Sequence, residues 1–397
     1  MSKKWKIISL IIVIISLFFI FYPKPVPVLS LSVSSDGRYV ISAHAGRDAD
    51  RHKPIGKLVL WDIEKKEKKV LAKNANAFSA AFVPDSHEFM WQDEKNVVHI
   101  QDVNGKEINS FPHFQVKTHI ISADKTFYLS SNMESHGQLY KGYGKDLIPV
   151  YTDGGFPFPL TLSMSENYFL SASNACFGDN DPVAETNLTA NPINPSSSKK
   201  GSYDEVTLWD RHTLKPFAIL NGNCGKTTGL ISPDGKWVIT GGENFRNFMW
   251  ETHNLTNRQR LANFRQGIYR EETETYDKSK LLPIPDKFKD KQMGLNHVVA
   301  IAFLSEKDFV LLDKRGNKNG TGNELARLYT VGDPWIKAYV EIGNNPSIST
   351  NYYQRNLSVS SSPKAHILVT GQATGGGINV YKYHPDKMEL EKIWVAD

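Results

Sequence analysis

The sequence predicts an all-β protein that repeats one four-stranded antiparallel sheet seven times behind a short apolar N-terminal segment. Three observations carry this prediction. A tight-turn phrase flanked by strand-forming residues recurs along the chain, and a strand ending in Trp-Asp or a variant of it follows. Residues beyond those that the four strands of a copy require lie at equivalent positions in the copies.

The clearest copy is Thr228–Glu251, TGLISPDGKWVITGGENFRNFMWE. Its β-branched and aromatic residues favour pleated strands around a turn. Pro233 sets the φ of that turn, Asp234 can bond its own backbone, and Gly235 adopts positive φ without steric cost. The three expected strands are Thr228–Ile231, Trp237–Thr240 and a strand that ends at Trp250-Glu251.

The turn phrase has seven copies, each between two strand-like stretches. The copies are Ser34-Ser35-Asp36-Gly37, Val83-Pro84-Asp85-Ser86, Ser122-Ala123-Asp124-Lys125, Ser163-Met164-Ser165-Glu166, Ser232-Pro233-Asp234-Gly235, Leu304-Ser305-Glu306-Lys307 and Ser360-Ser361-Ser362-Pro363. Four-stranded units repeated around a ring predict a seven-bladed β-propeller over residues 28–397. A β-sandwich is the alternative, but it does not require seven equivalent turns.

The third strand of each unit also repeats. Its clearest forms are Leu58–Asp62, Val97–Asp102, Val206–Asp210 and Asn247–Glu251. Trp-Asp at the end of this strand, together with Ser-Pro-Asp-Gly between the first two strands, resembles the WD40-repeat family of β-propellers. The resemblance covers about Pro27 to Asp397 and implies a rigid platform for protein binding that is not an enzyme.

The sequence is compatible with two ways of closing the ring. The last copy has a fourth strand of its own at Glu391–Val395, so it does not need an N-terminal strand to complete it. Val26–Leu29 could still add to that edge.

The N-terminus has the pattern of a signal anchor. Lysines within residues 1–6 precede an uncharged apolar run at 7–22, and a Pro-rich spacer follows at 23–27. A run of this length also fits a cleaved signal peptide, but Phe21 to Pro23 do not form a small-residue cleavage site. We therefore expect an uncleaved single-pass anchor in the inner or plasma membrane. The positive-inside rule predicts a cytoplasmic stub at 1–6 and a propeller on the periplasmic or extracytoplasmic side. The Lys- and Ile-rich anchor favours a bacterial origin.

The composition of the body argues against a nucleic-acid partner. The net charge is +5, but four of the 47 basic residues lie in or beside the N-terminal segment, which leaves 43 against 42 acidic residues. A nucleic-acid-binding protein requires a basic face. Protein partners and the membrane are therefore the expected contacts.

The added length points to one face of the ring as the binding site. The insertions lie between second and third strands or between blades, and in an up-and-down blade these connections emerge on the same side. The residues that bind partners usually lie in such loops. The residues that we expect to contact a partner are Arg47, Asp48, Arg51, His52, Phe177, Asp179, Asp181, Tyr269, Arg270, Glu272, Tyr276, Arg315 and Asn317.

Both cysteines are expected on that same face. Cys176 begins the insertion of the fourth copy, and Cys224 lies in the loop that leads to the fifth. In an extracytoplasmic body a Cys176–Cys224 disulfide would hold the base of that insertion. Two buried free thiols are the alternative.

The common catalytic and cofactor motifs are missing. There is no Gly-x-Ser-x-Gly, His-Glu-x-x-His, Cys-x-x-Cys or Gly-x-Gly-x-x-Gly. We therefore expect no cofactor, no metal and no catalytic residues. The alternative is an enzyme or a binder of a small ligand or metal that uses the central funnel. That function would require acidic or histidine side chains near the axis, where the sequence places mostly small or apolar residues.

Overall fold

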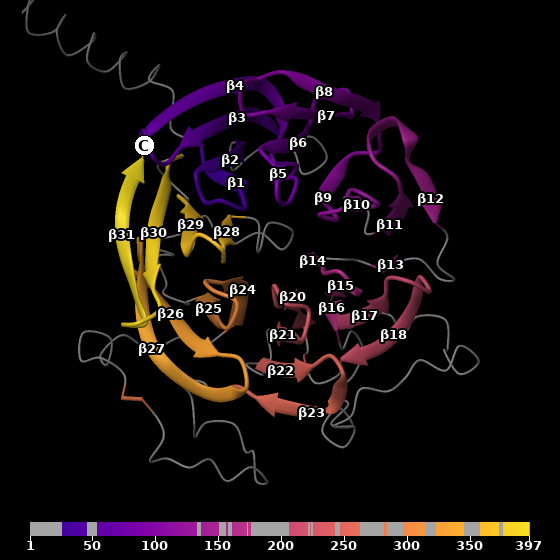
Figure 1. Ribbon diagram of the computed structural model, residues 1–397. Helices are drawn as coiled ribbons and strands as arrows, with labels where there is room; N and C mark the ends of the chain where they lie inside the picture. The colour runs from indigo at the N-terminus through magenta and orange to yellow at the C-terminus, as the bar shows by residue number, and fades with distance from the viewer. Residues whose placement is uncertain are drawn as a thin grey trace, which may run out of the picture.

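The computed structural model describes residues 26–45, 54–132, 136–150, 156–157, 161–172, 174–175, 206–220, 223, 225–242, 247–262, 282–283, 297–314, 323–344, 358–372 and 376–396. Over these residues the strands form seven antiparallel blades in a ring (Figure 1). The predicted all-β, seven-bladed propeller is confirmed. Within the same residues, no helix has the length and apolar character to cross a bilayer. The expected anchor at 7–22 lies outside them.

Consecutive strands pair within each blade, with the first strand near the axis and the fourth at the rim (Figure 1). Blades 1 to 3 contain β1 (Val28–Val33), β2 (Tyr39–His44), β3 (Ile55–Asp62), β4 (Glu67–Asn76); β5 (Ala81–Phe82), β6 (Glu88–Gln92), β7 (Val97–Asp102), β8 (Glu107–Pro112); and β9 (Val116–Ile121), β10 (Phe127–Asn132), β11 (His136–Lys141), β12 (Ile148–Val150). In blade 3, β13 (Phe156–Pro157) also pairs with β11, and a 3-10 turn, η1 (Gly144–Asp146), precedes β12.

Blades 4 to 7 follow the same order. They contain β14 (Thr161–Met164), β15 (Tyr168–Ala172), β17 (Val206–Asp210), β18 (Lys215–Leu220); β20 (Thr228–Ile231), β21 (Trp237–Gly241), β22 (Asn247–Glu251), β23 (Asn254–Arg260); β24 (His297–Phe303), β25 (Asp308–Lys314), β26 (Asn323–Thr330), β27 (Asp333–Asn344); and β28 (Val359–Ser362), β29 (Ile367–Gly371), β30 (Ile378–His384), β31 (Glu389–Ala396). A two-stranded ribbon of β16 (Asn174–Ala175) and β19 (Gly225–Lys226) lies beside blade 4.

The repeated turn phrase has a repeated geometry. In blade 1 the Ser34 hydroxyl donates to the Asp36 carboxylate over 2.6 Å and accepts the amide of Tyr39 over 2.9 Å. Gly37 takes a φ of +72°, which a side chain would disfavour. Residues 232–237 of blade 5 repeat these bonds. The serine and aspartate therefore hold the turn from inside, and the glycine allows its backbone.

The tryptophan of the third strand locks that strand to its neighbour. Three such tryptophans are fully buried. Their indole nitrogens donate to a hydroxyl on the second strand of the same blade: Trp61 to Ser42 (2.7 Å), Trp209 to Ser171 (3.2 Å) and Trp250 to Thr240 (3.2 Å). The acidic residue that follows has a different task, because Asp210 accepts the amide of Thr213 over 2.7 Å and so closes the next turn.

The hydrophobic core is divided among seams between neighbouring blades. Seven buried apolar clusters each draw side chains from two successive blades around the ring. In one of them, Val28 and Trp61 of blade 1 pack with Ile367 and Val380 of blade 7. A single blade cannot bury both of its faces, so its stability depends on both neighbours.

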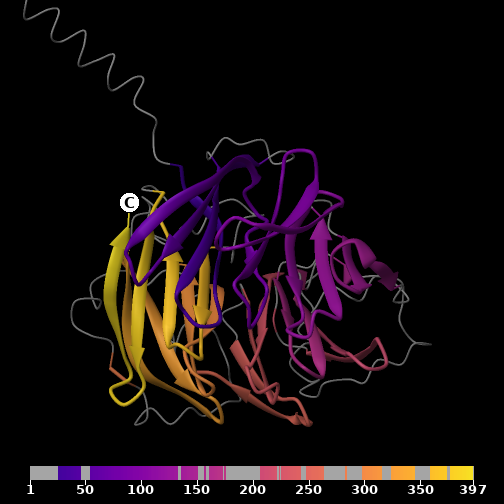
Figure 2. The same ribbon diagram turned by 45° about the horizontal axis from the view of Figure 1, so that its top comes forward.

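Blades 7 and 1 close the ring by packing face to face (Figure 2). All four strands of blade 7 come from the C-terminal part of the chain, so the fourth strand expected at Glu391–Val395 is present within β31. β1 is the innermost strand of blade 1 and pairs with β2. The Val33 amide donates to the Ser360 hydroxyl of β28 over 3.2 Å and ties the two blades together.

The turn of blade 7 lies later than the sequence predicts. The phrase expected at 360–363 falls largely within β28, and the connection to β29 occupies 363–366. Ser362 takes the role of the turn serine, because its hydroxyl accepts the amide of Ala365 over 3.3 Å. His366 adopts a φ of +56° near the end of this connection. A run of three serines left the register undetermined, since each could have been the turn residue.

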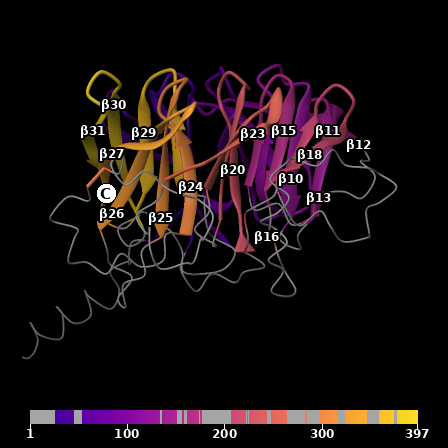
Figure 3. The same cartoon turned by 90° about the horizontal axis from the view of Figure 1, so that it is seen from below.

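The strands define two faces of the disc (Figure 3). We call the face with the connections between strands 1 and 2 and between strands 3 and 4 the turn face; it is uppermost in Figure 3. The opposite face, with the connections between strands 2 and 3 and between blades, is the loop face.

Candidate functional site

The two faces differ in how their strands are connected. Every connection on the turn face falls within the described residues and is short. The remaining internal segments all join strand ends on the loop face. The main ones are 46–53, 133–135, 176–205, 243–246, 263–281, 284–296, 315–322, 345–357 and 373–375. The insertion at 345–357, between blades 6 and 7, escaped the sequence analysis. The loop face is therefore the candidate site.

All of the expected contact residues lie outside the described residues. Arg47, Asp48, Arg51 and His52 fall between β2 and β3, and Arg315 and Asn317 between β25 and β26. The other expected contacts, which fall between β16 and β17 or between β23 and β24, are Phe177, Asp179, Asp181, Tyr269, Arg270, Glu272 and Tyr276. The described strands fix only where these segments leave the ring, and each leaves from the loop face.

The ribbon beside blade 4 bears on the cysteines. In the antiparallel pair β16–β19, Ala175 lies opposite Gly225. Cys176 directly follows β16, and Cys224 directly precedes β19; both lie outside the described residues. The disulfide stays a prediction.

A cavity of about 240 Å³ follows the axis of the ring. The innermost strands line it, among them β1, β9, β20 and β28. The lining side chains are small hydroxyl or aliphatic ones, such as Ser30, Leu162 and Ala300, and His119 is the one titratable residue among the described lining residues. No group of three metal-ligating side chains occurs in the described part of the chain.

Several hydroxyls along this channel accept hydrogen bonds from the neighbouring blade. Ser30 and Ser32 on β1 accept the amides of Ala80 and Phe82 in blade 2, over 3.2 and 3.0 Å. Blades 4 and 5 repeat the arrangement: Thr161 and Ser163 accept the amides of Gly229 and Ile231, over 3.1 and 3.0 Å. Alternate hydroxyls on an innermost strand thus join blade 1 to blade 2 and blade 4 to blade 5. The spacing Ser-x-Ser or Thr-x-Ser could have revealed this role in the sequence.

His119 acts as a brace between blades. One ring nitrogen lies 2.6 Å from the Ser79 carbonyl of blade 2, and the other lies 2.9 Å from the Tyr128 hydroxyl. The carbonyl can only accept, so the ring donates to Ser79 and accepts from Tyr128. Burial lowers the pKa of His119 to about 4, so it is neutral at pH 7. The channel therefore gives little support to acid–base chemistry.

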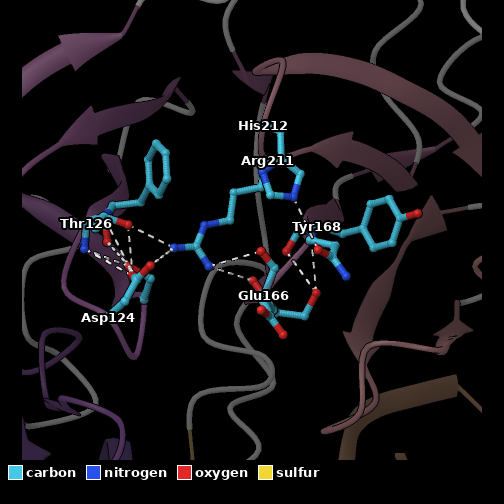
Figure 4. A network of polar contacts seen from close by, with 10 residues as sticks. Asp124, Thr126, Glu166, Tyr168, Arg211 and His212 are labelled. Atoms are coloured by element: carbon cyan, nitrogen blue, oxygen red, sulfur yellow. Dashed lines mark hydrogen bonds and ion pairs between the residues drawn. The ribbon is translucent and has the colours of Figure 1, made fainter.

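The turn face is braced by side chains that cross between blades, and Arg211 shows this best (Figure 4). Its guanidinium forms an ion pair with Asp124 and donates to the Thr126 hydroxyl over 2.8 Å, both in blade 3. It also donates to the carbonyls of Ser165 and Glu166 in blade 4, over 3.1 and 3.2 Å. Only 9% of the Arg211 side chain is exposed. No motif in the sequence marked this residue, which directly follows Trp209-Asp210.

Asp124 is ionised as a result. Partial burial would raise the pKa of its carboxyl, but hydrogen bonds from Ser122 and Thr126 and the contact with Arg211 outweigh burial. The pKa of Asp124 is therefore held far below its ordinary value. Because about half of the Asp124 side chain is exposed, solvent screens part of this interaction.

A second cavity, of about 500 Å³, opens on the turn face near blades 7, 1 and 2. Its charged lining residues are paired with each other. His87 lies 2.7 Å from the Asp36 carboxylate, and Lys364 forms an ion pair with Asp85. Each of its charged side chains thus already has a partner within the cavity.

No protein-family model matches the sequence, and no curated protein matches it. Solved structures do match in three dimensions. One is the crystal structure of Hsv2 from Kluyvelomyces marxianus, with a TM-score of 0.53 and 10% sequence identity over 94% of this chain and 99% of that chain. Another is KlHsv2 with loop 6CD replaced by a Gly-Ser linker, with a TM-score of 0.52, 11% identity and the same coverage. The likeness is one of fold. At this identity it carries no information on partner or activity.

Proposed function

We propose that the protein is a membrane-tethered scaffold that binds other proteins through the insertions on its loop face. One observation carries the proposal: the long insertions all leave the ring on one side, while every connection on the other side is short. Insertions that accumulated without selection would occur on both faces, because extra loop length costs little stability on either face. Loops on a rigid scaffold are where binding usually occurs.

The WD40-like motifs support the same function. Buried Trp61, Trp209 and Trp250 and the Ser-Pro-Asp-Gly turn resemble that family, whose propellers serve as interaction platforms. The channel favours this function over that of an enzyme or small-ligand binder. The hydroxyls of Ser30, Ser32, Thr161 and Ser163 accept hydrogen bonds from neighbouring blades, and His119 joins two blades.

The tether is proposed from the sequence alone. The lysines ahead of the apolar run at 7–22 support an anchor with residues 1–6 in the cytoplasm and the propeller in the extracytoplasmic space of a bacterial cell. The disulfide expected between Cys176 and Cys224 suits that compartment.

Cross-linking followed by affinity capture of the full chain from membranes tests the proposal. A variant with residues 177–204 replaced by a short Gly-Ser linker, which keeps both cysteines, should lose the captured protein. The matched control, Lys236→Ala on the turn face, should retain it, because this lysine is exposed and distant from the loop face. Capture that survives shortening of each loop-face insertion in turn would contradict the proposal.

A further inference from the structure

The chain enters the ring at the loop face, between blades 7 and 1. β1 begins there, because its C-terminal end leads into a connection on the turn face. The amide of Val28 donates to the Gln372 carbonyl of blade 7 over 3.2 Å, and Val28 is fully buried. A Cβ on Gly371 would lie 2.5 Å from the Cβ of Val28, so the two backbones are in close contact. The point of entry is therefore fixed.

A series of hydrogen bonds also fixes Val26, two residues before Val28. Trp61 donates to the Ser42 hydroxyl over 2.7 Å, and Ser42 lies 2.8 Å from Nε2 of His44. The Val26 carbonyl can only accept, so Nδ1–H of His44 donates to it over 3.4 Å, and Nε2 of the neutral ring accepts from the Ser42 hydroxyl. His44 is fully buried. Val26, the first residue of the chain that the structure describes, is thus tied to the core of blade 1.

The tether that precedes this point is short compared with the disc. Three residues, 23–25, separate the end of the apolar run from Val26. Fully extended, this link spans about 14 Å. β1 and β2 each have six residues, so the disc is at least about 20 Å high. A link that leaves the loop face cannot run around the disc and bring the turn face against the bilayer.

We infer that the loop face lies on the membrane side of the propeller and that its partner is a protein embedded in the same membrane. The inference rests on the proposed tether at 7–22. It turns the strand ends of the loop face toward the bilayer, where soluble proteins have the least access. Only the turn face is then open to the surrounding compartment.

Energy transfer from two positions in blade 2 tests the orientation. Lys95 lies on the β6–β7 connection at the loop face, and Lys106 lies on the β7–β8 connection at the turn face; both are exposed. The full chain with Lys95→p-azidophenylalanine or Lys106→p-azidophenylalanine, labelled with a donor dye, is reconstituted in phosphatidylcholine vesicles that contain an acceptor-labelled headgroup. We expect higher transfer efficiency from position 95. Insertion of twenty Gly-Ser residues after Lys24 should reduce the difference, because the longer link frees the disc.

The experiment distinguishes a wrong orientation from a wrong tether. Equal transfer, or higher transfer from position 106, by a protein that still floats with the vesicles would overturn the orientation and leave the tether intact. A protein that does not float with the vesicles would refute the tether, and the orientation with it. If the orientation holds but the protein captured through the loop face has no membrane segment, the assignment of the partner is wrong.

Discussion

The turn face and the loop face of the disc are built from the same strands but differ in what holds their connections. On the turn face, serine, aspartate and arginine side chains fix short turns and join blades, as Ser34 does within blade 1 and Arg211 does between blades 3 and 4. On the loop face, the chain adds long segments between strand ends. The described side-chain contacts thus hold the short turns and the seams, whereas the added length of the chain is confined to the loop face.

The largest loss of stability should come from a seam residue. Trp250→Ala removes a fully buried indole that packs between blades 4 and 5 and donates to Thr240. We expect a loss of about 3–5 kcal/mol in the free energy of unfolding, measured by denaturant titration. Trp250→Phe is the control, because it retains most of the volume and should cost less. A loss below about 1 kcal/mol for the alanine variant would show that the seam does not hold the ring.

The expected disulfide is the one loop-face feature for which we expect a large contribution to stability. Cys224→Ser should destabilise the protein by about 2–4 kcal/mol, because the cross-link limits the unfolded chain. Mass spectrometry of peptides under non-reducing conditions should show Cys176 joined to Cys224 in the wild type. Free thiols at both positions in protein isolated without reductant would contradict the prediction.

Arg211→Ala should destabilise the turn face by about 1–3 kcal/mol, because the loss of its guanidinium leaves two carbonyls and Asp124 without this partner. Lys236→Ala is the matched control. Its 3.6 Å ion pair with Asp234 is largely exposed, so its loss should change stability by less than about 0.5 kcal/mol. Equal effects in thermal or denaturant unfolding would mean that Arg211 is not a brace.

The smallest effect should come from shortening the loop face. Replacement of 315–322 by four Gly-Ser residues should change the free energy of unfolding by less than about 1 kcal/mol, since the cost of loop closure depends weakly on length. Insertion of the same four residues between Pro233 and Asp234 should cost more, because it breaks the bonds that hold that turn. If the two changes cost the same, the contrast between the faces is lost.

The sequence was sufficient for the blade count and for most strand positions. The φ of Gly235 and the bond from Trp250 to Thr240 lie within one blade, so the spacing of these residues along the chain reports these roles directly. The same local logic failed where it was degenerate, as in the three serines 360–362.

The contacts between blades were hidden from the sequence analysis. Arg211 meets Asp124 from far along the chain, and Ser163 meets the amide of Ile231 in the next blade. The Arg211–Asp124 pair depends on how blades pack, and no spacing within one copy encodes it, whereas the alternate hydroxyls of the innermost strands do leave a Thr-x-Ser or Ser-x-Ser spacing that was overlooked. The partner-binding residues were predicted only by position, from the face at which their segments leave the ring.

Hydrogen exchange of the full chain in membranes, with and without the captured partner, tests the central claim most directly. We predict that binding slows exchange in peptides that cover 176–205 and 263–296 and leaves the turn peptides 122–126, 211–214 and 232–236 unchanged. Protection of those turn peptides, with unchanged exchange across the loop-face insertions, would contradict the assignment of function to the loop face.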